Sequence, residues 1–301
     1  MTGQPGEAHA CRLDVVADQL VVVAGQLPDA LGDRPLGAFT QFVVAGLLDA
    51  MAETTAAVTA AVSAADALSA ALRRGDADLG GRFAVVPPRA GLIDTVRVAG
   101  TGDGHPPGLP LSGMDVAGLG WLTPFVSFLA EPLNQLRGNP VPVTEAALEF
   151  ERAAADVAAA AATYRGATAD AHTGFADALT ALAASSGVIA SALAGAAAAA
   201  ARVVGAVTWL VAEAVAAIVP VMAEAVAQAS ATLGQSVAEA IPRCVAIAAT
   251  AGGRAADRLT ALLASGQDLL DAADAATAVT RTARQMFEEI GNRNPAVGER
   301  A

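Results

Sequence analysis

The sequence has little of the chemistry that most enzymes use. Its 301 residues include one tyrosine, two cysteines, three histidines and no lysine. The missing lysine excludes a Walker-type phosphate loop, and neither a Gly-x-Ser-x-Gly elbow nor a His-Glu-x-x-His zinc motif occurs. We therefore expect no enzymatic activity and no cofactor. The alternative is an enzyme whose site leaves no mark in the sequence, which a deep pocket with convergent polar groups would reveal.

The histidines and cysteines are too scattered to predict a metal site. His9 and Cys11 lie close together, and the others are dispersed along the chain: His105, His172 and Cys244. The two cysteines could pair with each other, but two in a chain of this size make no disulfide framework and do not fix the redox compartment. We expect no bound metal.

Neighbouring carboxylates do not converge on one substrate either. Glu149 and Glu151 point in different directions on a helix, as do Glu288 and Glu289, so all four are expected to be solvated charges. The larger aromatic side chains are expected to anchor a core or an interface: Trp121, Trp209 and Phe287.

Basic charge is also scarce. The net charge is −12 at pH 7, which repels phosphate backbones and excludes a nucleic-acid partner. The N-terminus, MTGQPGEAHACRLDVVADQ, lacks a basic segment followed by an uninterrupted apolar stretch. A Sec or Tat signal peptide is therefore not expected, and export would need another route.

The sequence does contain long alanine-rich runs, which are typical of helices. Hydrophobic residues make up 54% of the chain and β-branched alternation is nearly absent, so we predict an all-α fold. One apolar stripe predicts a helix over 11–28. A second stripe predicts a longer helix over 38–74, with these residues roughly on one side: Phe39, Phe42, Leu47, Met51, Val58, Val62, Ala65, Leu68 and Leu72. These two helices form a hairpin with little core of its own, which usually needs a partner.

Glycine and proline gather in one segment, 80–120, which predicts a linker between two helical regions. Within it, GTGDGHPPG resembles a phosphate loop only superficially, because Pro106 and Pro107 block the helix that should follow. The predicted organisation is an N-terminal hairpin (1–79), the linker (80–120) and a larger helical region (121–301). We expect helical hairpins and an elongated helical bundle.

The only tyrosine stands at the joint of a second predicted hairpin. Thr144 is expected to cap a helix that ends near Tyr164-Arg165-Gly166. The apolar residues before this joint recur at alternating three- and four-residue steps: Val143, Ala147, Phe150, Ala154, Val157, Ala161 and Tyr164. A second stripe follows the joint: Phe175, Leu179, Leu182, Ser186, Ile189 and Leu193. The spacing predicts two antiparallel helices with heptad-like seams.

The last third carries an eleven-residue repeat. Polar residues recur at Arg202, Glu213, Glu224 and Gln235. An apolar stripe runs opposite to them: Val204, Val207, Val211, Val215, Ile218, Met222 and Val226. Such a repeat keeps both stripes on fixed faces of one helix, which Pro220 and Pro242 are expected to kink. The stripe from Val204 to Met222 is predicted to be an oligomer or membrane face, and a buried bundle face is favoured over a bilayer span because of the central acid and proline.

The stretch from about 133 to 195 resembles the actinobacterial WxG superfamily of type VII (ESX) secretion substrates. Gly138-Asn139-Pro140 stands where that family has a Gly-Asp-Pro-like opening, and Tyr164-Arg165-Gly166 stands at its Trp-x-Gly turn. Residues 12–78 are similar to EspC-like type VII secretion targets. The chain departs from both in lacking a Tyr-x-x-x-Asp/Glu export signal, since four residues after Tyr164 stands Thr168.

The resemblance implies a non-enzymatic protein that is secreted or surface-exposed without a signal peptide and works by helix pairing. Its partner would be a helical protein, a second copy, or the type VII machinery. It also implies that the aromatic rings near the turn contact the partner: Phe150, Tyr164 and Phe175, with Arg165 and Gly166. The alternative for Tyr164 is to cap an intramolecular bundle. The alternative function is an envelope-associated structural or oligomerising protein that contacts membrane through 186–250, with a cytoplasmic or membrane-associated location.

Overall fold

A computed structural model describes residues 5–27, 37–77, 141–165 and 173–295 of the chain. Within these ranges the protein is all-α and contains no strand. The predicted linker 80–120, the Gly138-Asn139-Pro140 opening, Trp121 and Gly166 lie outside the described residues.

The first two helices follow their sequence pattern closely. Helix α1 spans Pro5–Gln26 and so begins six residues before the predicted start, and α2 spans Ala38–Arg74 as predicted. At the end of α2, Gly75 adopts the left-handed conformation (φ 77°), and its N–H donates to the carbonyl of Leu72. Arg73 and Arg74 in the last turn favour the negative end of the helix dipole.

The predicted second hairpin is present. Helix α6 spans Val141–Arg165, α7 spans Thr173–Ala227, and the two run antiparallel side by side. The predicted cap is wrong by one turn: α6 begins at Val141, so Thr144 lies inside it. Pro142 near the helix start accounts for the earlier beginning, because its missing N–H costs no hydrogen bond in a first turn.

The eleven-residue repeat does not lie on one helix. Helix α7 ends at Ala227 and α8 spans Gln235–Arg293, so the chain reverses over 228–234. Gly234 allows the reversal with a left-handed φ of 85°, and its N–H donates to the carbonyl of Ala229 at 2.8 Å. Gln235 therefore belongs to the returning helix. Both helices continue through their exposed prolines, Pro220 and Pro242.

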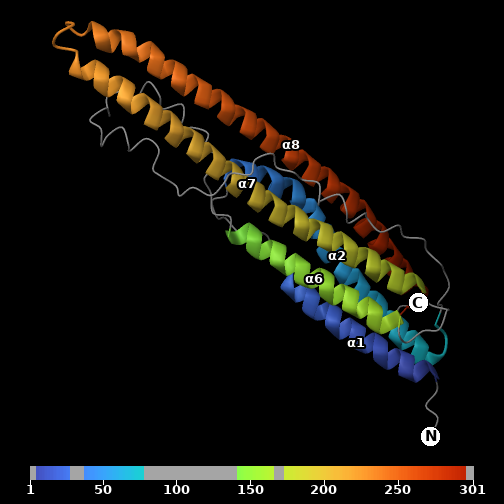
Figure 1. Ribbon diagram of the computed structural model, residues 1–301. Coiled ribbons are helices and arrows are strands. Elements are labelled where there is room, and N and C mark those ends of the chain that lie inside the picture. The colour runs from blue at the N-terminus through green and yellow to red at the C-terminus, as the bar shows by residue number, and fades with distance from the viewer. Residues whose placement is uncertain (1–4, 28–36, 78–140, 166–172, 296–301) are drawn as a thin grey trace.

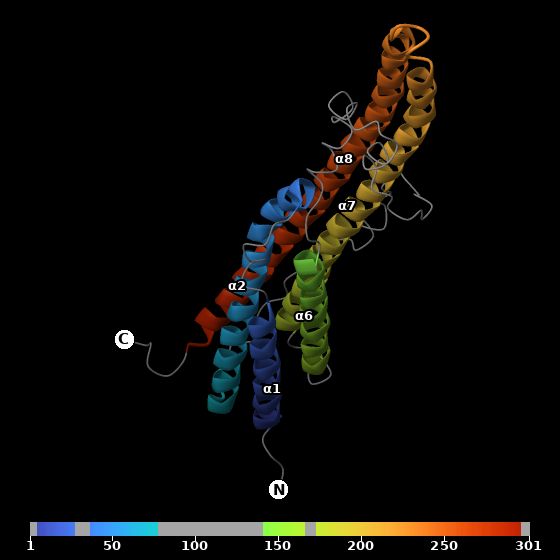
Figure 2. The ribbon, with the colours of Figure 1, turned by 90° about the vertical axis from the view of Figure 1, so that its left-hand side faces the viewer.

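The molecule has a thick half and a thin half (Figure 1). Helices α1, α2 and α6 pack beside the start of α7 and the end of α8, and beyond them α7 and α8 continue together as a pair (Figure 2). We call residues 203–262 the arm and the rest of the described residues the body. In the body part of α7 nearly every residue is buried or half-buried, whereas the arm part has a narrow buried seam: Val203, Val207, Leu210, Val211, Ala214, Ile218, Met222 and Ala225. This change in burial marks the place where one helix partner replaces several.

The N-terminal hairpin finds its partner within the same chain. Helix α2 packs against α8 and α7, and α1 packs against α6. The α2–α8 contact is close: Leu270 of α8 lies over Gly46, and Phe39 of α2 lies over Gly266. The predicted stripe on α2 is mostly correct, although Phe42 is 45% exposed and faces away from the core.

Candidate partner-binding surfaces

The predicted turn motif forms part of the core of the body. Tyr164 is 1% exposed, and its ring meets Phe175 edge-on with centroids 5.2 Å apart. Phe175 in turn meets Phe287 at 5.4 Å, and His9 lies 6.4 Å from Tyr164. These four rings come from α1, α6, α7 and α8, so the cluster joins four helices in one place.

This placement corrects the prediction that the aromatic rings face a second chain. Phe150, Tyr164 and Phe175 are all buried within the body, which matches the intramolecular alternative. Arg165 is half exposed and its Nη2 lies 2.7 Å from Oδ1 of Asp177, so it ties the end of α6 to the start of α7. No ring of the motif is left for a partner in this conformation.

The hydroxyl of Tyr164 is buried and has no hydrogen-bond partner among the described residues. Burial raises its pKa to about 12, because a phenolate would lose its hydration in this apolar site. The group therefore stays protonated and inert at neutral pH.

The predicted oligomer or membrane stripe is also internal. Val207, Val211, Val215, Ile218 and Met222 are buried against α8, and Val204 is partly buried. In this structure the chain reversal brings α8 onto the stripe, so the stripe is a buried bundle face, the alternative that the central acid and proline favoured. The apolar side chains that the arm exposes lie elsewhere: Trp209 (48%), Val226 (46%) and Leu233 (97%) on or beyond α7, with Val245 on α8.

Two helices are long and apolar enough to cross a membrane by length and composition, Ala38–Arg74 and Gly174–Ala227. The most apolar windows of these helices are 44% and 39% buried inside the protein. Core helices of soluble proteins pass the same test, so composition alone does not place either helix in a bilayer.

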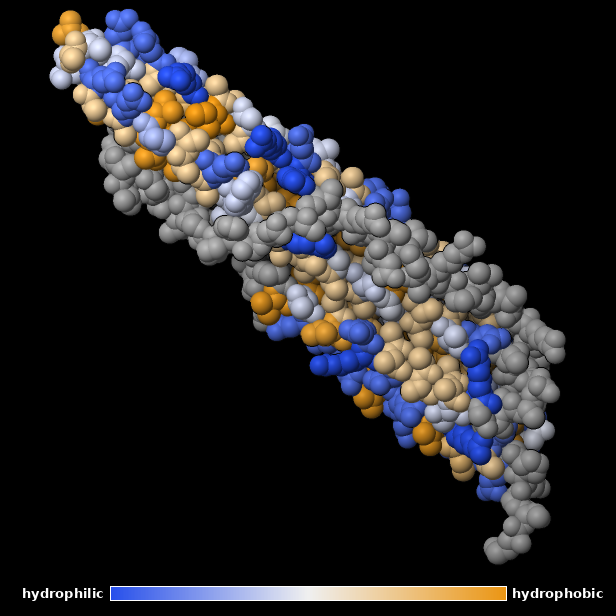
Figure 3. Space-filling model, viewed as in Figure 1, coloured by the Kyte–Doolittle hydropathy of each residue, from blue (hydrophilic) through white to orange (hydrophobic). Residues whose placement is uncertain are grey.

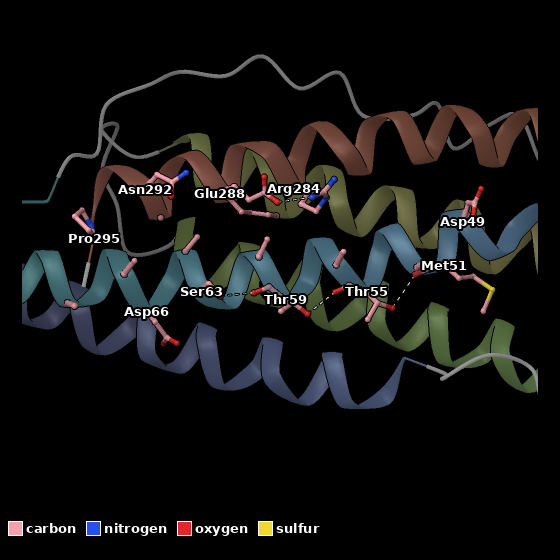
Figure 4. A pocket seen from close by; sticks show the side chains of 18 of the residues that line it. Asp49, Met51, Thr55, Thr59, Ser63, Asp66, Arg284, Glu288, Asn292 and Pro295 are labelled. Carbon is pink, nitrogen blue, oxygen red and sulfur yellow. Dashed lines mark hydrogen bonds and ion pairs between the residues drawn. The ribbon is translucent and has the colours of Figure 1, made fainter. Parts of the chain in front are cut away.

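A groove of about 1660 Å³ lies between α2 and the end of α8 (Figure 4). Its α2 side is a row of mostly small residues at heptad-like steps: Leu48, Ala52, Thr55, Thr59, Ser63, Asp66 and Ala70. Its other side is formed by Arg284, Glu288 and Gly291 of α8, and by Pro295 just beyond the end of α8, at similar steps. The groove is therefore bounded by two helix seams and extends about 33 Å along α2 at 1.5 Å per residue.

The hydroxyls in the groove are satisfied by their own helix. Thr55, Thr59 and Ser63 donate to the carbonyls of Met51, Thr55 and Thr59 at 3.1, 3.0 and 3.2 Å (Figure 4). Their methyl and methylene groups and the flanking alanines then form the surface. Such a surface permits close approach of another helix without leaving polar groups unpaired.

The groove is acidic. Asp49, Asp66 and Glu288 line it together with one guanidinium, Arg284. That guanidinium is already paired, with Glu53 at 2.6 Å and with Glu288 at 2.8 Å, and the hydrogen bond that it donates to Glu53 is the main cause that raises its pKa. The pKa of Asp66 is raised by burial and by the negative charges of Asp14 and Asp18 on α1. Negative potential therefore extends along the groove to α1.

The other candidate groups are surface or structural residues. Glu288 and Glu289 form ion pairs one turn apart, with Arg284 and Arg293, and Glu149 and Glu151 lie on α6. Cys11 is exposed on α1 and Cys244 is buried in α8, and they do not form a disulfide. Among the residues that the structure describes, no group of three or more His, Cys, Asp or Glu gathers as for a metal ion.

The space-filling view shows how unevenly apolar residues reach the surface (Figure 3). Patches of orange and tan cover the body and the arm, interrupted by blue hydrophilic residues. Sequence reasoning did not find the groove, because its α2 side reads as the polar back of an amphipathic helix. The regular spacing of small residues from Ala52 to Ala70 was the signal that could have indicated it.

No known protein family, no curated protein and no solved structure matches the chain.

Proposed function

We propose that this chain is a non-enzymatic helix-pairing protein of the type VII secretion kind, either a substrate or a secretion-associated protein. The observation that carries the proposal is the open groove between α2 and α8. Helix pairing needs a long surface with heptad-like spacing and small side chains, and the groove has both.

The resemblance supplies the secretion part of the proposal. Two antiparallel helices joined at Tyr164-Arg165 agree with the hairpin that the WxG superfamily implies, and α1–α2 agrees with the EspC-like hairpin. Because the turn aromatics are internal, pairing through the groove replaces pairing through the turn. The export signal would come from a partner chain bound there.

A second function is favoured by the arm. It exposes Trp209, Val226 and Leu233, and residues 225–238 around the reversal contain no charged side chain. An envelope-associated protein could place this end of the arm against a membrane surface, as tryptophan and leucine suit the interface.

Export tests the two functions together. A C-terminally tagged chain is expressed in its native host with and without an active type VII secretion ATPase, and filtrate, cytosol and membranes are blotted. We expect the protein in the filtrate only when the ATPase is active. Accumulation in the membrane fraction regardless of the ATPase would favour the envelope function, and cytosolic retention in both strains would exclude both.

A further inference from the structure

The groove between α2 and α8 is built for one kind of partner. We infer that it binds a single helix of another protein, an amphipathic helix with small apolar residues along its seam and basic side chains near both ends of that seam. This inference rests on the proposed function and names the partner class of the same site.

The shape of the groove favours a helix over a small molecule. It is open and long, and its α2 wall is a row of mostly alanine, serine and threonine between Leu48 and Ala70, interrupted by Asp66, with the hydroxyls of Thr55, Thr59 and Ser63 bonded to the helix itself. A small ligand needs an enclosed site with converging polar groups. A helix lying between α2 and α8 instead needs two seams at heptad-like spacing, which both walls provide.

The charges of the groove decide which kind of helix it binds. Asp49 lies toward one end of the groove and Asp66 toward the other, about 25 Å apart along α2 (Figure 4). Neither forms an ion pair with a described residue, whereas Arg284 is paired with Glu53 and Glu288. The groove therefore has unneutralised acid at both ends, which attracts basic side chains and repels acidic ones.

The same charges disfavour a second copy of this chain. Two α2 seams paired antiparallel about the middle of the groove would bring Asp49 of one copy near Asp66 of the other. Parallel pairing would bring each aspartate near its equivalent. Like charges meet in both arrangements, and the whole chain carries −12.

The experiment uses the full chain and two synthetic helical peptides as probes. Both peptides have the same alanine and leucine seam and a length that matches the groove; one carries lysine near both ends and the other carries glutamate. Binding is measured by fluorescence anisotropy at two salt concentrations. We expect the lysine peptide to bind at least about tenfold more tightly, with a preference that weakens at high salt.

Two matched variants locate the binding. Ala56→Trp fills the groove, and Ala158→Trp places the same side chain on the exposed face of α6. We expect the first to weaken binding of the lysine peptide about tenfold or more and the second to leave it unchanged. The double variant Asp49→Lys and Asp66→Lys is expected to reverse the preference between the peptides.

Several results would overturn the inference. They are equal binding of the two peptides, no binding of either at millimolar concentration, and equal effects of Ala56→Trp and Ala158→Trp. A dimer in light scattering that Ala56→Trp dissociates would assign the groove to a second copy instead. The export assay tests the proposed function separately. Charge-selective binding without export would contradict the secretion role and support helix binding in the groove. Export without selective binding would support the secretion role and contradict helix binding in the groove.

Discussion

At the scale of single residues, Tyr164 was expected to contact a partner at the turn and is instead buried in the core of the body. Its ring lies among His9, Phe175 and Phe287, and its hydroxyl is buried with no hydrogen-bond partner among the described residues. The ring stabilises the body through apolar burial. The hydroxyl loses its hydration on folding and forms no hydrogen bond that would compensate for the loss. The benzene ring is thus the part of Tyr164 that the fold uses.

Tyr164 is the only tyrosine, so its ionisation can be followed alone. Its folded pKa of about 12 lies above the unfolded value of about 10. Ionisation of this tyrosine therefore does not change the free energy of unfolding below pH 10. As the pH rises from 10 toward 12, the unfolded state loses the proton first, and the free energy of unfolding falls by about 2 to 3 kcal/mol in total. The tyrosinate absorption should appear near pH 12, or earlier only together with loss of helix by circular dichroism.

Tyr164→Phe is the matched control. It should have the same or greater stability at pH 7, because it removes an unsatisfied hydroxyl and keeps the ring. Because phenylalanine has no proton to lose, the variant should not show the loss of stability between pH 10 and 12 that ionisation of Tyr164 causes. A wild-type tyrosine that ionises near pH 10 in the folded protein would show that the hydroxyl reaches water.

At the scale of helices, glycines in α8 set how closely α2 approaches. A Cβ at Gly266 would lie 2.7 Å from Cε2 of Phe39 and 3.4 Å from Cγ2 of Val43. At Gly253, in the arm part of the same helix, nothing lies within 4 Å of the corresponding position. Gly266 therefore allows the close approach of α2, whereas the space beside Gly253 is open.

The two glycines should respond oppositely to alanine. Gly266→Ala should destabilise the protein by about 1 to 3 kcal/mol, because the stiff ring of Phe39 must move out of its place. Gly253→Ala should stabilise it by about 0.5 to 1 kcal/mol, because alanine restricts the unfolded chain and favours helix. Denaturant unfolding followed by circular dichroism measures both; stabilisation by Gly266→Ala would mean that α2 does not pack as closely as described.

At the scale of the whole molecule, the described chain is a bundle that thins into a pair of helices. The body holds the aromatic cluster, the close α2–α8 contact and the Arg284–Glu53 ion pair. The arm has one seam of valine, leucine, alanine, isoleucine and methionine and no aromatic ring in that seam. Stability per residue should therefore fall from the body to the arm.

Hydrogen exchange should resolve this gradient within one helix. Amides of α8 in the arm, from 240 to 255, should exchange at least about tenfold faster than those in the body, from 272 to 287, because local opening of the arm exposes less apolar surface. The exchange is read by mass spectrometry on peptides from α8. Equal protection in both parts would show that arm and body open as one unit.

The helices were predictable from the sequence because periodicity reports which side of a helix is buried. The stripe in α2 and the two stripes beside Tyr164 gave the right elements and, except for Phe42, the right inner faces. The reversal at 228–234 was missed, since the eleven-residue spacing continues across it by coincidence and only Gly234 interrupts the helical composition. The predicted kinks at Pro220 and Pro242 did not prevent either helix from continuing.

The binding surface could not be predicted, because a stripe shows that a face is buried but not what buries it. The stripe from Val204 to Met222 suits an oligomer or membrane face as well as a buried bundle face, and in the structure α8 covers it. Tyr164 was assigned to a partner, and α1 and α7 enclose it. Only the three-dimensional arrangement shows which faces the described helices leave uncovered, and the small-residue row on α2 is one of them.

The long separation between α2 and its partner α8 has a consequence for synthesis on the ribosome. Glu53 and Arg284 are 231 positions apart, so the first hairpin leaves the exit tunnel about 10 to 50 s before the end of α8 does, at ordinary elongation rates. During that interval the apolar side of α2 has no α8 to cover it. The nascent chain is then open to holding factors and to early capture by a partner, before the last helix arrives to close the body.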